Sequence, residues 1–127
     1  MTDRFPTRVI PYARGGELDA SRTFYTDVLG FEVSMEDPVL GLTSPANRSA
    51  QVLIPASGFE DPQPHFGIDL GDPEAVDAAH AAAVERGMRV VYALRNETWG
   101  VRRFFVEDPS GTIINVLAHT TEVEPRR

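Results

Sequence analysis

Two polar side chains lie where they could do chemistry, Asn115 and His65. Asn115 is the only polar residue in the run Ile113-Ile114-Asn115-Val116-Leu117-Ala118, which has the composition of a strand buried on both faces. A buried amide without a hydrogen-bond partner costs about 1–3 kcal/mol. Asn115 therefore either bonds neighbouring backbone in the core or faces a lined cavity, and the sequence leaves both interpretations open.

His65 follows Pro64 at the start of a second strand-like segment, residues 65–70. Side chains alternate along a strand, so His65 and Asp69 share a face, as a general acid–base pair would require. A histidine at the end of a strand can equally be a surface group. No nucleophile elbow or phosphate-binding loop is present, so the catalytic residues stay unassigned.

The composition excludes other kinds of chemistry. The chain has no Cys, which removes disulfides and thiolate ligands, and its 12 basic residues are all Arg, which removes lysine Schiff bases. A net charge of −7 disfavours nucleic acid as a partner. No apolar run approaches the ~18 residues of a membrane span, and the first residues lack a signal pattern. We expect a cytoplasmic protein with a small-molecule partner and no membrane contact.

An internal repeat predicts the elements that position these residues. Each half reads strand, helix, strand, strand, strand, with Gly30 and Gly87 ending the helices and Asp72 capping the second one. The predicted segments are 8–12, 17–29, 31–35, 39–43 and 50–54, then 65–70, 72–86, 88–93, 101–106 and 112–118. The predicted fold class is α/β (α+β): two βαβββ modules, 5–55 and 65–119, with mixed sheets curled around a shared cleft. We expect residues 1–121 to form one domain with a linker at 56–64, and residues 122–127 to form a disordered tail.

The repeat also allows positions to be compared within the chain. Gln51-Val52-Leu53 echoes Asn115-Val116-Leu117, and the position opposite His65 is Arg8 or Ile10, depending on which glycines are aligned. The residues predicted to face the cleft are therefore Gln51, His65, Asn115 and one of Arg8 and Ile10.

Several phrases resemble one known superfamily. Leu18-Asp19-Ala20-Ser21-Arg22-Thr23-Phe24-Tyr25, Val28-Leu29-Gly30-Phe31 and Phe105-Val106-Glu107-Asp108-Pro109-Ser110-Gly111 are similar to the vicinal oxygen chelate superfamily, which includes glyoxalase I, extradiol dioxygenases and bleomycin resistance proteins. The resemblance implies paired βαβββ modules and a homodimer. It also implies a divalent metal held by His, Glu or Gln, with the last ligand position at Asn115 and only His65 and Gln51 matching the others. Neutral donors of this kind make a poor site for a divalent cation.

Metal-free members of that superfamily bind drugs or metabolites in the same cleft. The strand phasing that the resemblance implies points Arg103 and Phe105 inward with Asn115, where Arg103 offers a fork to a carboxylate or phosphate. The predicted ligand-binding residues are Tyr12, Gln51, His65, Trp99, Arg103, Phe105 and Asn115. The predicted function is metal-independent binding of a small aromatic or anionic molecule, without a cofactor, such as drug or antibiotic sequestration. The alternatives are a metal-dependent lyase, isomerase or dioxygenase using His65, and a protein-interaction module.

Overall fold

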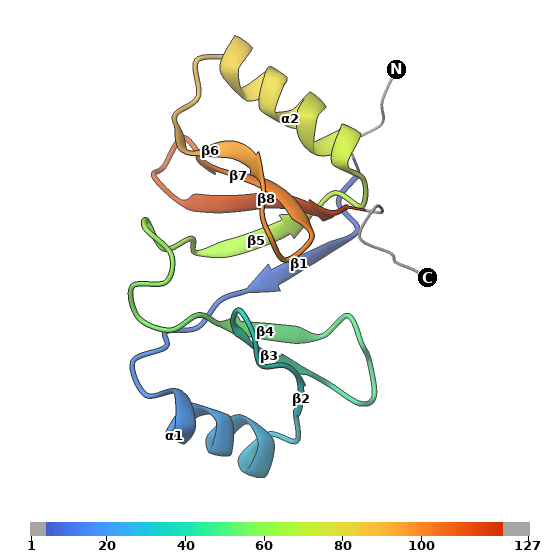
Figure 1. The fold of residues 1–127 in the computed structure, drawn as a ribbon, viewed down its shortest axis with the longest axis vertical. Coiled ribbons are helices and arrows are strands. Elements are labelled where there is room, and N and C mark those ends of the chain that lie inside the picture. Colours follow the sequence, from blue (N-terminus) through green and yellow to red (C-terminus); the bar gives the residue numbers. More distant parts are fainter. Residues whose placement is uncertain (1–4, 121–127) are drawn as a thin grey trace. The chain divides into compact units, whose positions relative to one another are not determined.

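The computed structural model describes residues 5–120, so the expected tail at 122–127 lies outside the described residues. The fold is mixed α+β, with a five-stranded mixed sheet, a three-stranded sheet and two helices in the described residues (Figure 1). The chain divides into two compact units, Met1–Val9 with Pro64–Arg127, and Ile10–Gln63. No helix among residues 5–120 has the length and apolar character needed to cross a bilayer.

The five-stranded sheet has the order β1-β5-β8-β7-β6 and belongs to the first unit, except for residues 10–11 at the end of its first strand. Its strands are β1 (Arg8–Pro11), β5 (Phe66–Asp69), β6 (Val90–Asn96), β7 (Val101–Glu107) and β8 (Ile113–His119). Strand β5 runs parallel to β8, whereas β7 is antiparallel to both β8 and β6. The sheet is therefore mixed, as the sequence predicts.

Helix α2 (Pro73–Glu85) covers one face of this sheet (Figure 1). The Asp72 carboxylate accepts a hydrogen bond from the Glu74 backbone N–H at 2.9 Å, which confirms the predicted N-cap. Val76 of the helix is fully buried in a cluster with Phe104, Val116 and Ala118. Because side chains alternate along a strand, the neighbours of these residues in β7 and β8 point to the opposite face.

The second unit contains an antiparallel three-stranded sheet with the order β2-β3-β4. The strands are β2 (Glu32–Met35), β3 (Leu40–Thr43) and β4 (Gln51–Ile54). The helix expected over 17–29 is present as α1 (Leu18–Thr23) followed by the π-helical turn η1 (Phe24–Val28).

The core of the second unit lies on one face of its sheet. Leu40, Leu42 and Ile54 are buried there, and Leu18 and Tyr25 of the helical segment pack against them. The expected pairing of four strands in each half is wrong in one respect, because the first strand of the chain pairs with β5 instead.

Three contacts fix that first strand to the end of β5. The Thr7 N–H donates to the Asp69 carbonyl oxygen at 2.8 Å, and the Thr7 hydroxyl donates to the same oxygen at 3.0 Å. Arg8 Nε donates to the Asp69 carboxylate at 2.8 Å. The three-stranded sheet is therefore left with only an isolated parallel bridge, between Tyr12 and Leu53, in place of a fourth strand. The pseudo-repeat gives sheets of unequal size.

Candidate functional site

The sheet face turned away from α2 carries most of the residues selected from the sequence. Phe105 of β7 and Gly67 of β5 both lie opposite Asn115 of β8 in the strand register. Directly opposed residues point to the same side of a sheet, which places Phe105 and Asn115 on one face. Alternate residues of one strand also share a side, and Arg103 therefore lies on this face with Phe105. Arg102 points the other way, where its Nε donates to Asp77 of α2 at 2.6 Å.

Arg103 is buried, with only 4% of its surface exposed, and it lies inside a group of aromatic rings. The central carbon of its guanidinium is 4.9 Å from the ring centre of Tyr92, 5.2 Å from that of Trp99 and 4.9 Å from that of Phe105. The rings of Tyr92 and Phe105 are also stacked, with centroids 4.4 Å apart. Each cation–π contact of this kind contributes about 0.5–2 kcal/mol, so the three rings both stabilise the charge and hold its position.

Glu97 is a central residue of this cluster that sequence reasoning missed. Its carboxylate accepts hydrogen bonds from Arg103 Nε at 2.8 Å and from the Tyr92 hydroxyl at 2.5 Å, and Arg95 Nε lies 3.5 Å away. Burial acts to raise the pKa of Glu97, but the bonds from Tyr92 and Arg103 outweigh it and lower the pKa below its ordinary value of 4.5. Glu97 follows the last residue of β6, Asn96, in the turn before β7, where an acid is usually solvated.

The ion pair changes what Arg103 offers to a ligand. The sequence predicts that the Arg103 guanidinium receives a ligand carboxylate or phosphate. In the structure the Glu97 carboxylate already occupies the Nε edge of that guanidinium. Anion binding by Arg103 stays a prediction, and the contacts observed are those with Glu97 and with the rings of Tyr92, Trp99 and Phe105.

His65 lies at the first position before β5 and is exposed. Its backbone N–H donates to the Ile113 carbonyl at 2.8 Å, and its ring Nδ1 accepts a hydrogen bond from the Ile113 N–H at 3.0 Å. The acid–base pair expected with Asp69 does not form. Four residues of strand separate the two by about 13 Å, and the Asp69 carboxylate bonds Arg8 and the Gly71 N–H instead.

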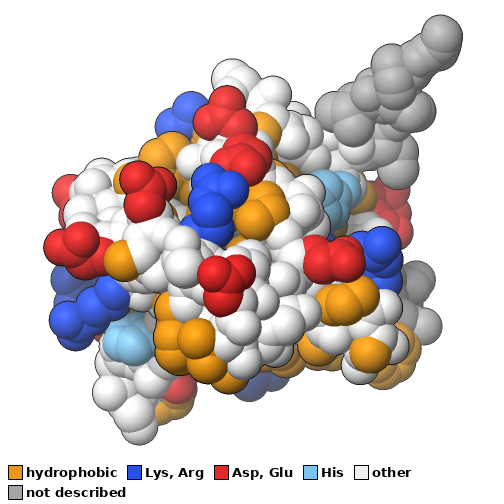
Figure 2. All heavy atoms as spheres, turned by 90° about the horizontal axis from the view of Figure 1, so that it is seen from below, with side chains coloured by type: hydrophobic (Ala, Val, Ile, Leu, Met, Phe, Trp, Pro, Cys, Tyr) orange, Lys and Arg blue, Asp and Glu red, His pale blue; other side chains and the backbone are white. Residues whose placement is uncertain are grey.

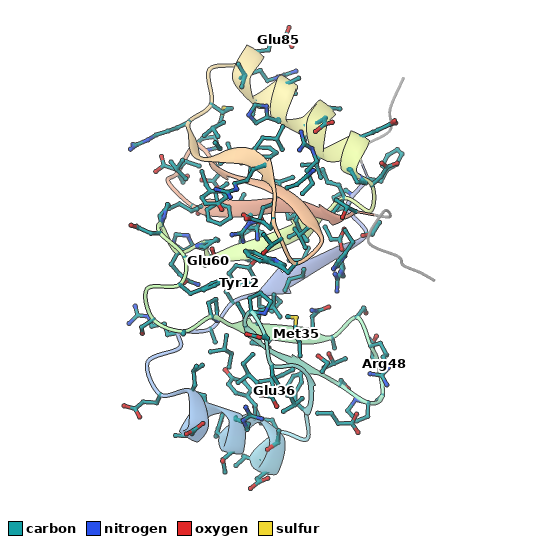
Figure 3. All side chains as sticks on the ribbon, viewed as in Figure 1. Tyr12, Met35, Glu36, Arg48, Glu60 and Glu85 are labelled. Atoms are coloured by element: carbon teal, nitrogen blue, oxygen red, sulfur yellow. The ribbon has the colours of Figure 1, made fainter. Side chains whose placement is uncertain are left out.

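Tyr12 and Gln51 belong to the second unit. Tyr12, which is labelled in Figure 3, makes an isolated parallel bridge to Leu53. Gln51 lies opposite Thr43 in the β3–β4 register. These positions alternate with the buried Leu42 and Ile54, so they lie on the face that the core of this unit does not use. The structure thus groups Trp99, Arg103, Phe105 and Asn115 with His65 on one sheet, and places Tyr12 and Gln51 on the other sheet.

A hydroxyl pair beside Gln51 was also missed from the sequence. The buried Thr43 donates through its hydroxyl to Ser34 Oγ at 2.8 Å, on the same face of the three-stranded sheet. Neither residue stands out in the sequence, because Ser and Thr are common in strands and turns. Ser34 lies at the bulge that shifts the β2–β3 register between Val33 and Met35.

The side chains present do not fit a divalent metal of the kind that the resemblance implies. Among residues 5–120, no three His, Cys, Asp or Glu side chains converge on one point. Two buried acids of the first unit, among the residues that the structure describes, are engaged: Glu97 with Arg103 and Asp69 with Arg8. Asn115 supplies an amide where a carboxylate is needed, and the Nδ1 atom of His65 is already an acceptor for backbone.

Comparison with known proteins agrees with this architecture. A family model described as the Glyoxalase/Bleomycin resistance protein/Dioxygenase superfamily matches residues 10–116. A search of curated proteins by sequence found no match. A glyoxalase/bleomycin resistance protein/dioxygenase superfamily member from Vibrio splendidus is 20% identical, with a TM-score of 0.62 over 87% of this chain and 97% of that one.

Two further solved structures have enzyme names. Methylmalonyl-CoA epimerase from Mycobacterium tuberculosis is 19% identical, with a TM-score of 0.72 over 97% of this chain and 95% of that one. An extradiol ring-cleaving dioxygenase from B. fuscum is 27% identical, with a TM-score of 0.67 over 91% of this chain but only 33% of that one. Similarity at these identities and coverages establishes the fold and leaves the chemistry to the residues of the site.

Proposed function

The chain belongs to the Glyoxalase/Bleomycin resistance protein/Dioxygenase superfamily, and we propose that within it this chain binds a small aromatic or anionic molecule without a metal ion. The observation that carries the proposal is the aromatic group of Tyr92, Trp99 and Phe105, beside Asn115, on the sheet face that α2 leaves uncovered. Apolar rings with a few directed polar groups are typical of small-molecule sites.

Three features support binding over metal-assisted chemistry. The buried carboxylates of Asp69 and Glu97 are bound to arginines, and the Nδ1 atom of His65 accepts a backbone hydrogen bond. The amide of Asn115 stands at the last ligand position that the resemblance implies. Trp99 is 38% exposed, so a ligand can reach at least one ring of the aromatic group. Sequestration of an aromatic drug is the form of this function that we propose. The metal-dependent lyase, isomerase or dioxygenase is the alternative that the experiment below separates from it.

Binding can be followed directly, because Trp99 is the only tryptophan of the chain. We expect benzoate and benzamide to change the fluorescence of Trp99 and raise the melting temperature, since a ligand that binds only the folded state stabilises it. Both effects should persist after dialysis against a chelator. Elemental analysis of the dialysed protein should find much less than one Ni, Zn, Fe or Mn ion per chain.

Variants at two asparagines test the location. Replacing Asn115 by Leu keeps the volume but removes the amide, and we expect affinity for benzamide to fall about tenfold, the effect of losing one to two hydrogen bonds. Asn96→Leu is the matched control, because the Asn96 side chain bonds Arg102 on the α2 face of the sheet. Binding that disappears with the chelator and returns with a metal would contradict the proposal, as would the absence of any response to either probe.

We also propose a homodimer, supported by exposed apolar side chains of the second unit. Phe24, Val28 and Leu29 are about half exposed or more, at 48%, 66% and 53%. Hydrophobic side chains appear between acidic and basic ones on the surface drawn in Figure 2. Exposed apolar surface of this kind favours association. We expect sedimentation to give twice the 14.0 kDa chain mass, and Val28→Glu to shift the protein toward monomer. A monomer at high concentration would contradict this expectation.

A further inference from the structure

The ring of His65 takes the place of a backbone acceptor at the start of the parallel β5–β8 ladder. The first residue of β8, Ile113, has both of its backbone groups bonded to this one residue. Its carbonyl accepts from the His65 N–H at 2.8 Å, and its N–H donates to His65 Nδ1 at 3.0 Å. The ring is therefore held in one orientation by the sheet that it extends.

This hydrogen bond determines where the ring carries its proton. A nitrogen that accepts a hydrogen bond must present a lone pair, and a neutral imidazole has one proton for its two nitrogens. With Nδ1 as the acceptor, the proton lies on Nε2. Coordination of a metal through Nε2 would need the lone pair there and the proton on Nδ1, where it would face the Ile113 N–H. Two donors would then oppose each other, and the bond would be lost.

The Nε2 edge of the His65 ring points away from the contact with the Ile113 backbone. His65 is exposed, whereas Asn115 is only 3% exposed and Phe105 is fully buried. Gly67 lies opposite Asn115 in the register, and His65 precedes Gly67 by two residues, so all three positions share one face of the sheet. The Nε2–H group is thus a donor at the accessible end of a face that continues into the aromatic group.

We infer that His65 is a hydrogen-bond donor to an oxygen atom of the ligand, through Nε2–H, and not a metal ligand. The ligand class is an aromatic molecule with a carbonyl, carboxylate or phenolic oxygen. The tautomer follows from the Ile113 contact alone, whereas the ligand contact rests on the proposed function.

The tautomer can be read by NMR on protein labelled with ¹⁵N. The chain has three histidines, and the spectrum of His65→Asn identifies the signals of His65 by their loss. We expect a pyridine-type shift for Nδ1 and a pyrrole-type shift for Nε2 of His65, unchanged when one equivalent of Zn²⁺ is added. The reverse pattern, or a zinc-dependent shift of Nε2, would overturn the inference whether or not any ligand binds.

Two substitutions at His65 test the Nδ1 edge and the Nε2 edge of its ring separately. Asn places its amide near the position of Nδ1 and Gln places its amide near that of Nε2. We expect His65→Asn to keep the melting temperature near that of the parent and to lower benzamide affinity about 3- to 10-fold, the effect of one hydrogen bond. His65→Gln should lower the melting temperature and keep the affinity within about threefold.

The outcomes distinguish this inference from the proposed function. If benzamide binds and His65→Asn binds it as tightly as the parent, the donor role is wrong and the proposed function stands. If neither benzamide nor benzoate binds the parent protein, the proposed function fails, and with it the ligand contact. The NMR result then decides the tautomer by itself.

Discussion

Replacing Gly15 by Ala is expected to destabilise the second unit severely. A Cβ atom at this position would lie 1.8 Å from the Pro55 carbonyl oxygen and 2.7 Å from its carbon. Both are backbone atoms, so no side chain can turn aside to make room. Overpacking against a side chain costs about 1–3 kcal/mol, and a backbone clash this short should cost at least the upper end of that range. Urea unfolding should show the loss as a lower midpoint.

The adjacent glycine provides a matched control. A Cβ atom built on Gly16 has Ser57 Oγ, 4.0 Å away, as its nearest neighbour, so Gly16→Ala introduces an ordinary contact. We expect its unfolding midpoint to equal or slightly exceed that of the parent, because Ala restricts the unfolded chain. Equal midpoints for Gly15→Ala and Gly16→Ala would show that the segment before α1 does not approach Pro55 as closely as the structure has it.

The two glycines show what a sequence conveys about a fold and what it leaves out. Gly15-Gly16 marks the connection to the first helix, and that much is predictable, as are the N-cap of α2 at Asp72 and the turn at Gly111. These features are local, because each depends on residues close in the chain. Which of the two glycines needs its missing side chain depends on Pro55, about forty residues away, and no local pattern encodes that approach.

Which strands pair with each other also depends on contacts between residues far apart in the chain. The repeated order of elements predicts the helices and strands, and the superfamily is confirmed by the family model over residues 10–116. The pairing of β1 with β5 instead of a strand of its own half depends on contacts of Thr7 and Arg8 with Asp69. Those contacts join residues more than sixty positions apart, so equal sheets were the natural expectation from the repeat.

The site was predictable in part, for a related reason. Asn115 could be selected because it is the one amide in an apolar run, and Phe105 because of the strand phasing that the resemblance implies. The register places the two residues opposite each other. Glu97 could not, because its importance arises only when the β6–β7 hairpin folds back and brings Tyr92 and Arg103 to the same carboxylate. An acid in a turn is usually solvated, and only the register distinguishes a buried one.

Neutralising Glu97 is expected to have the second large effect on stability. Glu97→Gln removes the charge that Arg103 faces, and removing one partner of a buried ion pair costs about 3–5 kcal/mol. Asp77→Asn is the matched control, because the Asp77–Arg102 pair lies at the surface, where a pair contributes about 0–1 kcal/mol. At pH 7 the urea midpoints of unfolding of the parent and Asp77→Asn should be nearly equal, and both should lie well above the midpoint of Glu97→Gln.

The dependence on pH separates the charge of Glu97 from its shape. Its pKa is lowered in the folded state, so its stabilisation is fully present above the ordinary value of 4.5 and is lost as the pH falls through the folded-state pKa. Glu97→Gln lacks this titration. The difference in unfolding free energy between the parent and Glu97→Gln should therefore be constant from pH 7 to above 5 and shrink below about 4.5. A difference that stays constant down to pH 3 would mean that Gln disturbs the packing of Tyr92 and Arg103, and that the carboxylate charge itself does not hold the aromatic group together.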